Sequence, residues 1–356
     1  MSCAAQYGPR VPYPHAATSY PGGVVAPART SSRLVPGIPE SARLHVVTGK
    51  GGTGKTTVAA ALAMVLAEGG RRTLLAEVEG RQSLAQLFDV PALPYQERRL
   101  ATARGGGEIV GLAVDAELAL LEYLQMFYNL KRAARALRRM GAIDFATTLA
   151  PGVRDVLLTG KVKEAATRTG RDGRIVYDAV VLDAPPTGRI RQFLEATTEV
   201  ANLTKAGPIN RQSTGVLELL HSTRTAVHIV TLLEEMPVQE TVDAAADLTA
   251  AGLHLGAVVV NRARPILVQQ GQVGPDGAVD ISGLAHGLGA VGVNAAFAAP
   301  LATQLVEYAD RQALQAEHRA QLASVRAPRI ELPDLTPPVD VGELNELADY
   351  FLADTR

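Results

Sequence analysis

The feature that most constrains the fold is a glycine-rich stretch at residues 49–57, Gly-Lys-Gly-Gly-Thr-Gly-Lys-Thr-Thr, between an apolar run at 44–47 and an alanine-rich segment at 58–66. This pattern predicts a strand, a loop and a helix in that order. Four glycines allow backbone amides to close around an anion, and the helix that follows presents free N–H groups and its positive dipole end to the same point. The stretch is therefore predicted to be a phosphate-binding loop.

Two side chains of this loop are predicted to serve a bound nucleotide. The GxxxxGK[ST] spacing places Lys55 within reach of the β- and γ-phosphates and the Thr56 hydroxyl where it can ligate Mg²⁺. The alternative is a plain glycine-rich turn, but such a turn need not carry Lys-Thr directly after its last glycine. The residues predicted to contact the nucleotide here are Gly49, Gly51, Gly52, Thr53, Gly54, Lys55, Thr56 and Thr57.

A second lysine, Lys50, lies inside the same loop. With it, the loop resembles the deviant P-loops of the arsenite-pump, cell-division and nitrogenase-iron-protein ATPases. This resemblance implies that Lys50 reaches across a dimer to the nucleotide of the partner subunit. The alternative is that Lys50 serves as a local counter-charge for the phosphates of its own subunit.

Composition narrows the class of protein. The chain has 356 residues with a net charge of −1, which suits one large α/β domain and gives no basic excess for nucleic acid. Apolar runs are interrupted well before the roughly 18 residues that span a bilayer. A single cysteine, Cys3, excludes an internal disulfide and a zinc or arsenite site built from cysteines of one chain. We therefore expect a cytoplasmic protein.

The sequence predicts a disordered N-terminal part and a folded remainder. Residues 1–41 are rich in proline, alanine, glycine and serine without apolar periodicity, so we expect a disordered N-terminal arm. Its prolines favour a flexible tail over an organelle transit peptide. Residues 42–356 are predicted to form one P-loop ATPase domain with helical insertions at about 115–170 and 197–224.

Acidic residues follow two of the predicted buried strands. The strand at 73–79 carries Glu77 and Glu79 near its end, and the strand at 180–183 ends in Asp183, which is followed by a glycine-containing loop. Ligands of open α/β sheets bind beyond the carboxyl ends of the strands. Asp183 is therefore predicted to hold Mg²⁺ directly or through water, and the loop after it to sense the γ-phosphate. A capping role for Asp183 is the alternative.

The remaining pattern alternates strands with helices. Further strands are predicted at 109–114, 226–233, 255–260 and 329–332, and helices at 116–139, 238–249, 295–324 and 341–352. This alternation predicts a doubly wound, mostly parallel sheet. The helix at 116–139 has an apolar face and a basic end, for which core packing and a solvated surface are the favoured interpretation and a client groove the alternative. Asn261 ends a strand with an amide that can pair with adenine, although asparagine also starts turns.

Beyond the arm, these residues resemble one family along nearly the whole chain: the ATPases of arsenite pumps and of the guided entry of tail-anchored proteins (the ArsA/GET family), in particular its paired actinobacterial members. The resemblance implies a P-loop NTPase that binds ATP and Mg²⁺ and works as a homodimer or as a heterodimer with a paralogous ATPase. It also implies that Asn261 and the loop at Pro333 hold adenine, and that Asp183 coordinates the water shell of Mg²⁺. The motifs that carry the resemblance are at 49–57, 83–88, 151–155, 183–188, 234–241, Asn261 and Pro333.

Several residues depart from the family pattern. Glu79 stands where the first switch of the family usually has aspartate, and residues 183–189 read Asp-Ala-Pro-Pro-Thr-Gly-Arg in place of Asp-Thr-Ala-Pro-Thr-Gly-His. These changes leave the hydrolysis rate open. One alternative is that Glu79 is a surface acid and Glu77 is the carboxylate near Mg²⁺. The Cys-x-x-Cys zinc staple is absent, and only one P-loop copy is present.

The sequence as a whole thus predicts a Mg²⁺-dependent ATPase that switches between open and closed dimers. By resemblance, ATP hydrolysis would be coupled to loading and release of a hydrophobic client or membrane partner. The alternatives are a non-catalytic, ATP-bound regulatory or assembly subunit and an anion-pump ATPase subunit. The residues predicted to act in catalysis are Lys50, Lys55, Glu79 and Asp183, and Thr56 and Asp183 are the predicted metal ligands.

Overall fold

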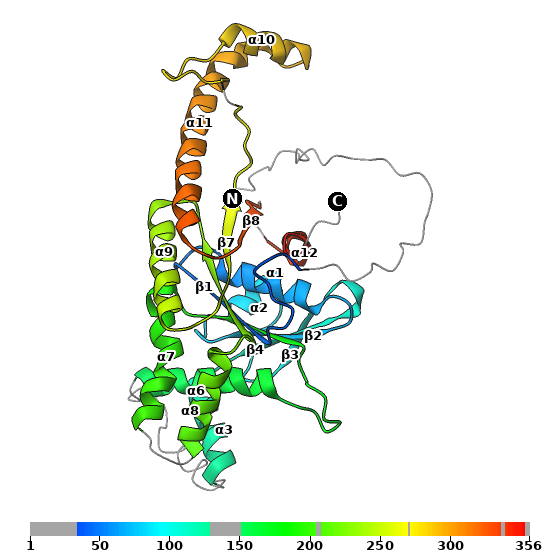
Figure 1. Ribbon diagram of the computed structural model, residues 1–356. Helices are drawn as coiled ribbons and strands as arrows, with labels where there is room; N and C mark the ends of the chain where they lie inside the picture. The colour runs from blue at the N-terminus through cyan, green and yellow to red at the C-terminus, as the bar shows by residue number, and fades with distance from the viewer. Residues whose placement is uncertain (1–33, 129–150, 204–207, 270, 336–338, 353–356) are drawn as a thin grey trace, which may run out of the picture. The chain divides into compact units, whose positions relative to one another are not determined.

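The computed structural model describes residues 34–128, 151–203, 208–269, 271–335 and 339–352, which form an α/β/α sandwich around an eight-stranded sheet (Figure 1). The strand order is β3-β4-β2-β5-β1-β6-β7-β8, and every neighbouring pair is parallel except β3 with β4. The strands are β1 Leu44–Gly49, β2 Arg72–Glu77, β3 Arg98–Thr102, β4 Glu108–Ala113, β5 Ala179–Asp183, β6 Thr225–Thr231, β7 Leu255–Ala263 and β8 Arg329–Pro333.

Helices cover both faces of this sheet. On one face, α1, α2 and α12 pack into one hydrophobic cluster, and on the other face α6, α7, α8 and α9 pack into a second. The described helices are α1 Lys55–Ala67, α2 Ser83–Leu87, α3 Ala116–Tyr128, α6 Pro151–Thr167, α7 Thr187–Leu203, α8 Pro208–Leu220, α9 Glu235–Ala250, α10 Ile281–Ala290, α11 Ala298–Gln321 and α12 Val341–Asp349, with short 3-10 turns at Arg104–Gly106, Ala295–Phe297 and Leu322–Ser324.

The doubly wound, mostly parallel sheet that the sequence predicted is confirmed. Its central strands β1 and β6 are buried along their whole length, because a sheet covered on both faces needs apolar residues at successive positions. Helix α1 is also buried almost all round, since it lies between the sheet and α12. Among the described residues, no helix is both long and apolar enough to cross a membrane.

Three expectations need correction or completion. The predicted arm 1–41 is wrong over its last residues, because Leu34 and Ile38 are buried and Leu34 forms a bridge with Leu352. Strand β3 was not predicted: it is a half-exposed, antiparallel edge strand, so its sequence lacks a buried apolar pattern. The helix predicted at 116–139 is described as far as Tyr128, and its basic end lies outside the described residues.

Candidate nucleotide site

The loop between β1 and α1 has the backbone shape of a phosphate cradle. Gly54 has a φ of +86°, a conformation that residues with a side chain rarely adopt. A Cβ at Gly49 would lie 2.1 Å from a carbonyl oxygen of β6, so that position also requires glycine. A Cβ at Gly51 or Gly52 would instead meet nothing within 4 Å. Gly49 and Gly54 are thus required by the backbone of the loop, whereas Gly51 and Gly52 leave space beside it for an anion.

Asn261 braces this loop from the neighbouring end of β7. Its Nδ2 donates to the Thr53 carbonyl oxygen at 2.9 Å, and its Oδ1 accepts from the Arg262 amide at 3.0 Å. Pro333 of β8 is paired with Ala263, which follows Asn261 by two residues on the neighbouring strand β7. Sequence reasoning missed the bracing role of Asn261, and the adenine contacts of Asn261 and Pro333 stay predictions.

Thr56 and Asp183 meet across the first turn of α1. The Thr56 hydroxyl donates to Asp183 Oδ2 at 2.6 Å, because β5 lies next to β1 and ends at Asp183. Burial raises the pKa of Asp183 to about 6, opposed by the Thr56 hydrogen bond and the charge of Lys55. A hydroxyl beside a carboxylate is a hard-oxygen pair that suits Mg²⁺, whose charge would favour the ionised Asp183.

The protein provides few side chains that could coordinate a metal at this site. Among the described residues there is no group of three or more His, Cys, Asp or Glu side chains that could hold a metal ion. Mg²⁺ commonly keeps several waters and takes its other ligands from substrate phosphates. Thr56 and Asp183 therefore fit a magnesium ion that arrives with the nucleotide.

Lys55 brings a positive charge to the centre of the site. It is 9% exposed, and its Nζ lies 3.5 Å from the Lys50 carbonyl oxygen, at the outer limit of a hydrogen bond. Burial lowers the pKa of Lys55, while the charges of Asp183 and Glu79 act in the opposite direction. A buried ammonium gains most from a close anion, so a phosphate at this position would be strongly favoured.

Glu77 and Glu79 have different surroundings. The Glu77 carboxylate is buried and accepts the amides of Gln82 at 2.6 Å and Leu84 at 3.1 Å, so it holds the start of α2. Strand β2 ends at Glu77, and Glu79 lies in the loop beyond it, 3.5 Å from Arg81. Glu79 lines a small pocket of about 40 Å³ together with Lys55 and other polar residues. Glu77 lines the same pocket, so both carboxylates lie at the site, but that of Glu77 is already held by two backbone amides.

Lys50 points toward α9 and the start of α7 of its own chain. Its ammonium pairs with one carboxylate oxygen of Glu240 on α9, and the other oxygen accepts from the Thr187 hydroxyl at 3.1 Å. Thr187 is the first residue of α7, directly after the loop that follows Asp183. Sequence reasoning did not single out Glu240, although it lies in the 234–241 motif that carried the family resemblance.

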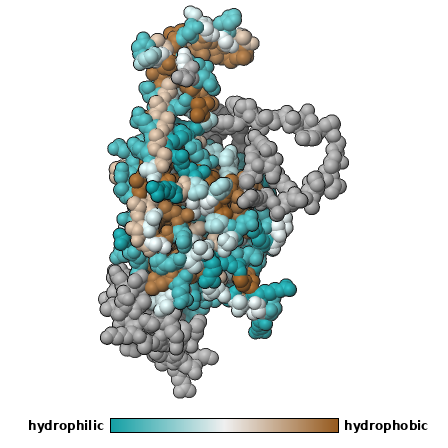
Figure 2. Space-filling model, in the orientation of Figure 1, coloured by the Kyte–Doolittle hydropathy of each residue, from teal (hydrophilic) through white to brown (hydrophobic). Residues whose placement is uncertain are grey.

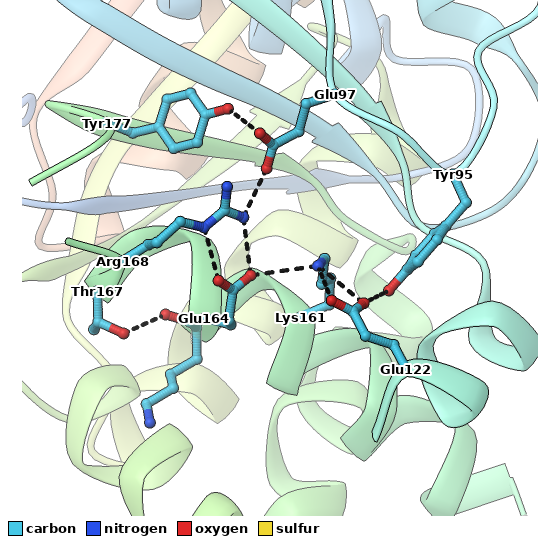
Figure 3. A network of polar contacts seen from close by, with 9 residues as sticks. Tyr95, Glu97, Glu122, Lys161, Glu164, Thr167, Arg168 and Tyr177 are labelled. Carbon is cyan, nitrogen blue, oxygen red and sulfur yellow. Dashed lines mark hydrogen bonds and ion pairs between the residues drawn. The ribbon is translucent and has the colours of Figure 1, made fainter. Parts of the chain in front are cut away.

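A larger cavity of about 420 Å³ lies elsewhere, between the start of β3 and the helices α3 and α6. A polar network lies around it, in which Arg168 donates to Glu164 at 2.7 Å and pairs with Glu97 at 2.7 Å (Figure 3). Lys161 donates to both oxygens of Glu122, at 2.9 and 3.0 Å. These contacts fasten α3 and α6 to the sheet edge. The network consists of Tyr95, Glu97, Glu122, Lys161, Glu164, Arg168 and Tyr177.

An apolar surface is the third notable feature. Residues 281–306 contain no Asp, Glu, Lys or Arg. Figure 2 shows hydrophobic side chains gathered over α10 and the neighbouring end of α11. Isolated exposed apolar residues are normal, but a group of them often marks an interaction surface. The large exposed residues of this surface are Ile281, Val291, Val293 and Phe297, with Ile266 and Leu267 nearby in sequence.

Comparison with known proteins identifies the family and relatives of this chain. The family model described as "Anion-transporting ATPase" matches residues 42–222. The chain is 53% identical to "ATPase BagA" of Mycobacterium tuberculosis over 311 residues, which are 86% of this chain and 92% of that protein.

More distant relatives share part of the chain. A "Putative arsenical pump-driving ATPase" of Halobacterium salinarum is 30% identical over 242 residues, 64% of this chain and 36% of that protein. A "Putative arsenical pump-driving ATPase 2" of Aquifex aeolicus is 24% identical over 255 residues, 63% of this chain and 81% of that protein. From the family match and the similarity to BagA, the chain belongs to the ArsA ATPase family and is an ATP-hydrolysing enzyme with a P-loop fold.

Proposed function

We propose that this protein is a Mg²⁺-dependent ATPase whose binding and hydrolysis of ATP drive a switch between two dimer arrangements. The observation that carries this proposal is the convergence of Lys55, Thr56, Glu79 and Asp183 on one pocket at the carboxyl ends of β1, β2 and β5. This is the edge at which open α/β sheets bind their ligands. No other group of described residues combines an open phosphate cradle with a buried lysine and a hydroxyl–carboxylate pair.

Each residue has a role that follows from its surroundings. The open amides at Gly51 and Gly52 and the Lys55 ammonium bind phosphate oxygens. Thr56 and Asp183 would hold Mg²⁺, which would supply a Lewis acid for phosphate oxygens. Glu79 orients and deprotonates the attacking water.

Hydrolysis is expected to be slow. Glu79 is one methylene longer than the aspartate of relatives, and it pairs with Arg81 in this structure. A water displaced by about 1 Å from its in-line position can lower the rate on the order of a hundredfold. A shorter side chain at this position, as in Glu79→Asp, should therefore raise the rate of hydrolysis.

Two features of the phosphate-binding loop support the proposed dimer. The chain has one P-loop, and Lys50 within that loop is partly exposed, so a second subunit would supply the second site. That subunit is either a second copy or a paralogous ATPase. The apolar surface over α10 supports a hydrophobic client or membrane partner, by the chemistry of its side chains.

An anion-pump ATPase subunit is the second candidate, because two relatives are named as arsenical pump-driving ATPases. Arsenite is a soft thiophile that prefers thiolates. The chain has one cysteine, Cys3, so one chain cannot offer the three sulfurs that would hold it. We therefore favour the client-loading switch.

Steady-state hydrolysis of ATP by the purified protein tests these alternatives. We expect turnover that disappears on chelation of Mg²⁺ and that arsenite does not stimulate. ATP binding without turnover would instead support the non-catalytic regulatory subunit. Saturable stimulation by arsenite that survives Cys3→Ser would support the anion pump.

A further inference from the structure

One carboxylate in this structure holds two parts of the site that a switch must move. Glu240 lies on α9, outside the phosphate-binding loop and outside the loop after β5. One of its oxygens pairs with Lys50 in the phosphate-binding loop, and the other accepts from Thr187, the first residue of α7. A carboxylate with both oxygens engaged by different segments ties the positions of those segments together.

The surroundings of this pair indicate a contact that can be exchanged. The side chains of Lys50 and Glu240 are 32% and 33% exposed, so neither charge is sealed in the core. Half-exposed ion pairs contribute little to fold stability, because water competes for both partners. By contrast, the loop after β5 is fixed to β1 by buried contacts: the Thr48 hydroxyl donates to the Pro185 carbonyl oxygen at 2.7 Å, and the Ala184 amide donates to Val47.

We propose that Glu240 is a positioning residue that retains Lys50 within its own subunit until a closed dimer forms. This inference rests on the proposed dimeric switch. If Lys50 serves the nucleotide of the partner subunit, its ammonium must leave Glu240, so the carboxylate competes with the partner's phosphates for one cation. The strength of the Glu240 contact then sets part of the free energy of closure.

Departure of Lys50 would also change the contact of Glu240 with the start of α7. Once the ammonium leaves, Glu240 retains only the hydroxyl of Thr187, and a partly buried carboxylate forms stronger hydrogen bonds when its charge is not otherwise neutralised. Thr187 is the first residue of α7, so a movement of Lys50 in the phosphate-binding loop would change a contact at the start of that helix. Glu240 therefore couples the movement of Lys50 to the loop that senses the γ-phosphate.

The first test measures retention of Lys50 in nucleotide-free protein. A paired ammonium is a poorer nucleophile than a free one, so acetylation of Lys50, followed by mass spectrometry, should be several-fold faster in Glu240→Gln than in the wild type. Glutamine keeps the shape of the side chain and a hydrogen bond to Thr187 but removes the charge. Glu235→Gln, an exposed change on the same helix, is the matched control and should leave the rate unaltered. An equal rate in Glu240→Gln and wild type overturns the inference.

The second test measures closure by sedimentation with Mg²⁺ and a non-hydrolysable ATP analogue. Each retained lysine is expected to weaken closure about three- to tenfold, and two subunits contribute, so Glu240→Gln should tighten the dimer about ten- to hundredfold. In a Lys50→Met background the same change should have no effect, because the contact that it removes is already gone.

These measurements separate this inference from the dimeric switch on which it rests. A wild type that stays monomeric with the analogue, alone and with its paralogue, overturns both. If the wild type and Glu240→Gln dimerise equally well, the retaining role of Glu240 is overturned and the dimeric switch is not. A stabilising effect of Glu240→Gln that persists in the Lys50→Met background also overturns it, since Glu240 would then act through another contact.

Discussion

The nucleotide pocket and the network of Figure 3 are built from the same kinds of side chain. Each combines lysine or arginine with several carboxylates. They differ in how these groups are used. Lys161 has Glu122 oxygens at 2.9 and 3.0 Å, whereas Lys55 has a carbonyl oxygen at 3.5 Å. The network satisfies its own charges, and the pocket keeps a cation available.

The larger of the two cavities is not the one whose chemistry suits a phosphate. The cavity at the network has a volume of about 420 Å³ and the pocket at Lys55 one of about 40 Å³. Size alone would therefore select the wrong place for a phosphate. A ligand site is better recognised by polar groups that lack close partners than by empty volume, because those groups gain free energy from the ligand.

The largest expected effect is at Lys55. Lys55→Ala should weaken ATP binding by more than about a hundredfold, because it removes the cation that faces two phosphates. Titration calorimetry measures the affinity directly. Lys161→Ala is the matched control, a lysine of the network that should leave ATP affinity within about twofold. Equal losses in the two variants would remove the distinction between pocket and network.

Next in size is the effect of Glu79 on turnover. Glu79→Gln should lower hydrolysis about a hundredfold with ATP affinity retained, because glutamine keeps the shape but cannot take the proton. Glu79→Asp should raise the wild-type rate. Single-turnover kinetics measure both.

Glu77→Gln is the comparison variant for this experiment. Glu77 accepts two backbone amides, so its change should lower stability before it lowers the rate per folded molecule. Near-normal turnover in Glu79→Gln together with lost turnover in Glu77→Gln would move the catalytic role to Glu77.

A moderate effect is expected in the network. Arg168→Met leaves Glu164 and Glu97 without their shared cation and should lower the free energy of unfolding by about 1–3 kcal/mol. Urea denaturation measures this loss, and ATP turnover per folded molecule should change less than twofold. A loss of turnover at unchanged stability would show that the network takes part in the reaction cycle.

The smallest effect near neutral pH comes from two buried histidines behind the phosphate-binding loop. His45 on β1 and His228 on β6 share a hydrogen bond of 3.0 Å, and the Ala257 amide donates to His228 at 3.1 Å. Burial lowers the pKa of His45 to about 4 and that of His228 well below its ordinary value. Both rings are therefore neutral in the folded protein at neutral pH.

This pair makes stability depend on pH in one direction. Unfolded histidine titrates near 6.5, so the free energy of unfolding is greatest above about pH 6.5. It falls as the pH drops below this value, by up to about 1.4 kcal/mol per pH unit for each histidine that stays neutral in the folded protein. In His228→Gln the slope between about pH 6 and 5 should fall by about half, whereas His286→Gln, an exposed change, should not alter it. An unchanged slope in His228→Gln would show that the pair is not the source.

Sequence patterns located the fold and most of the pocket for physical reasons. Successive buried residues in β1, β5 and β6 leave long apolar runs, and the glycine pattern at 49–57 is a local requirement of the loop. The partners of these residues are not local. Glu240 is distant in sequence from Lys50, and Asn261 from Thr53, so their contacts depend on strand order. Strand β3 escaped prediction because an exposed edge strand needs no apolar period.

The position of β1 at the centre of the sheet has a consequence for synthesis of the chain. Strand β1 is made early, yet its two neighbours are β5, at 179–183, and β6, at 225–231. A nascent chain that ends before β5 has the whole phosphate-binding loop but neither strand that supports it. Such long-range pairings form late, because the intervening segment must first be ordered. We therefore expect ribosome-bound chains to acquire ATP binding only after β6 has emerged, so that nucleotide cannot guide the first folding steps of the domain.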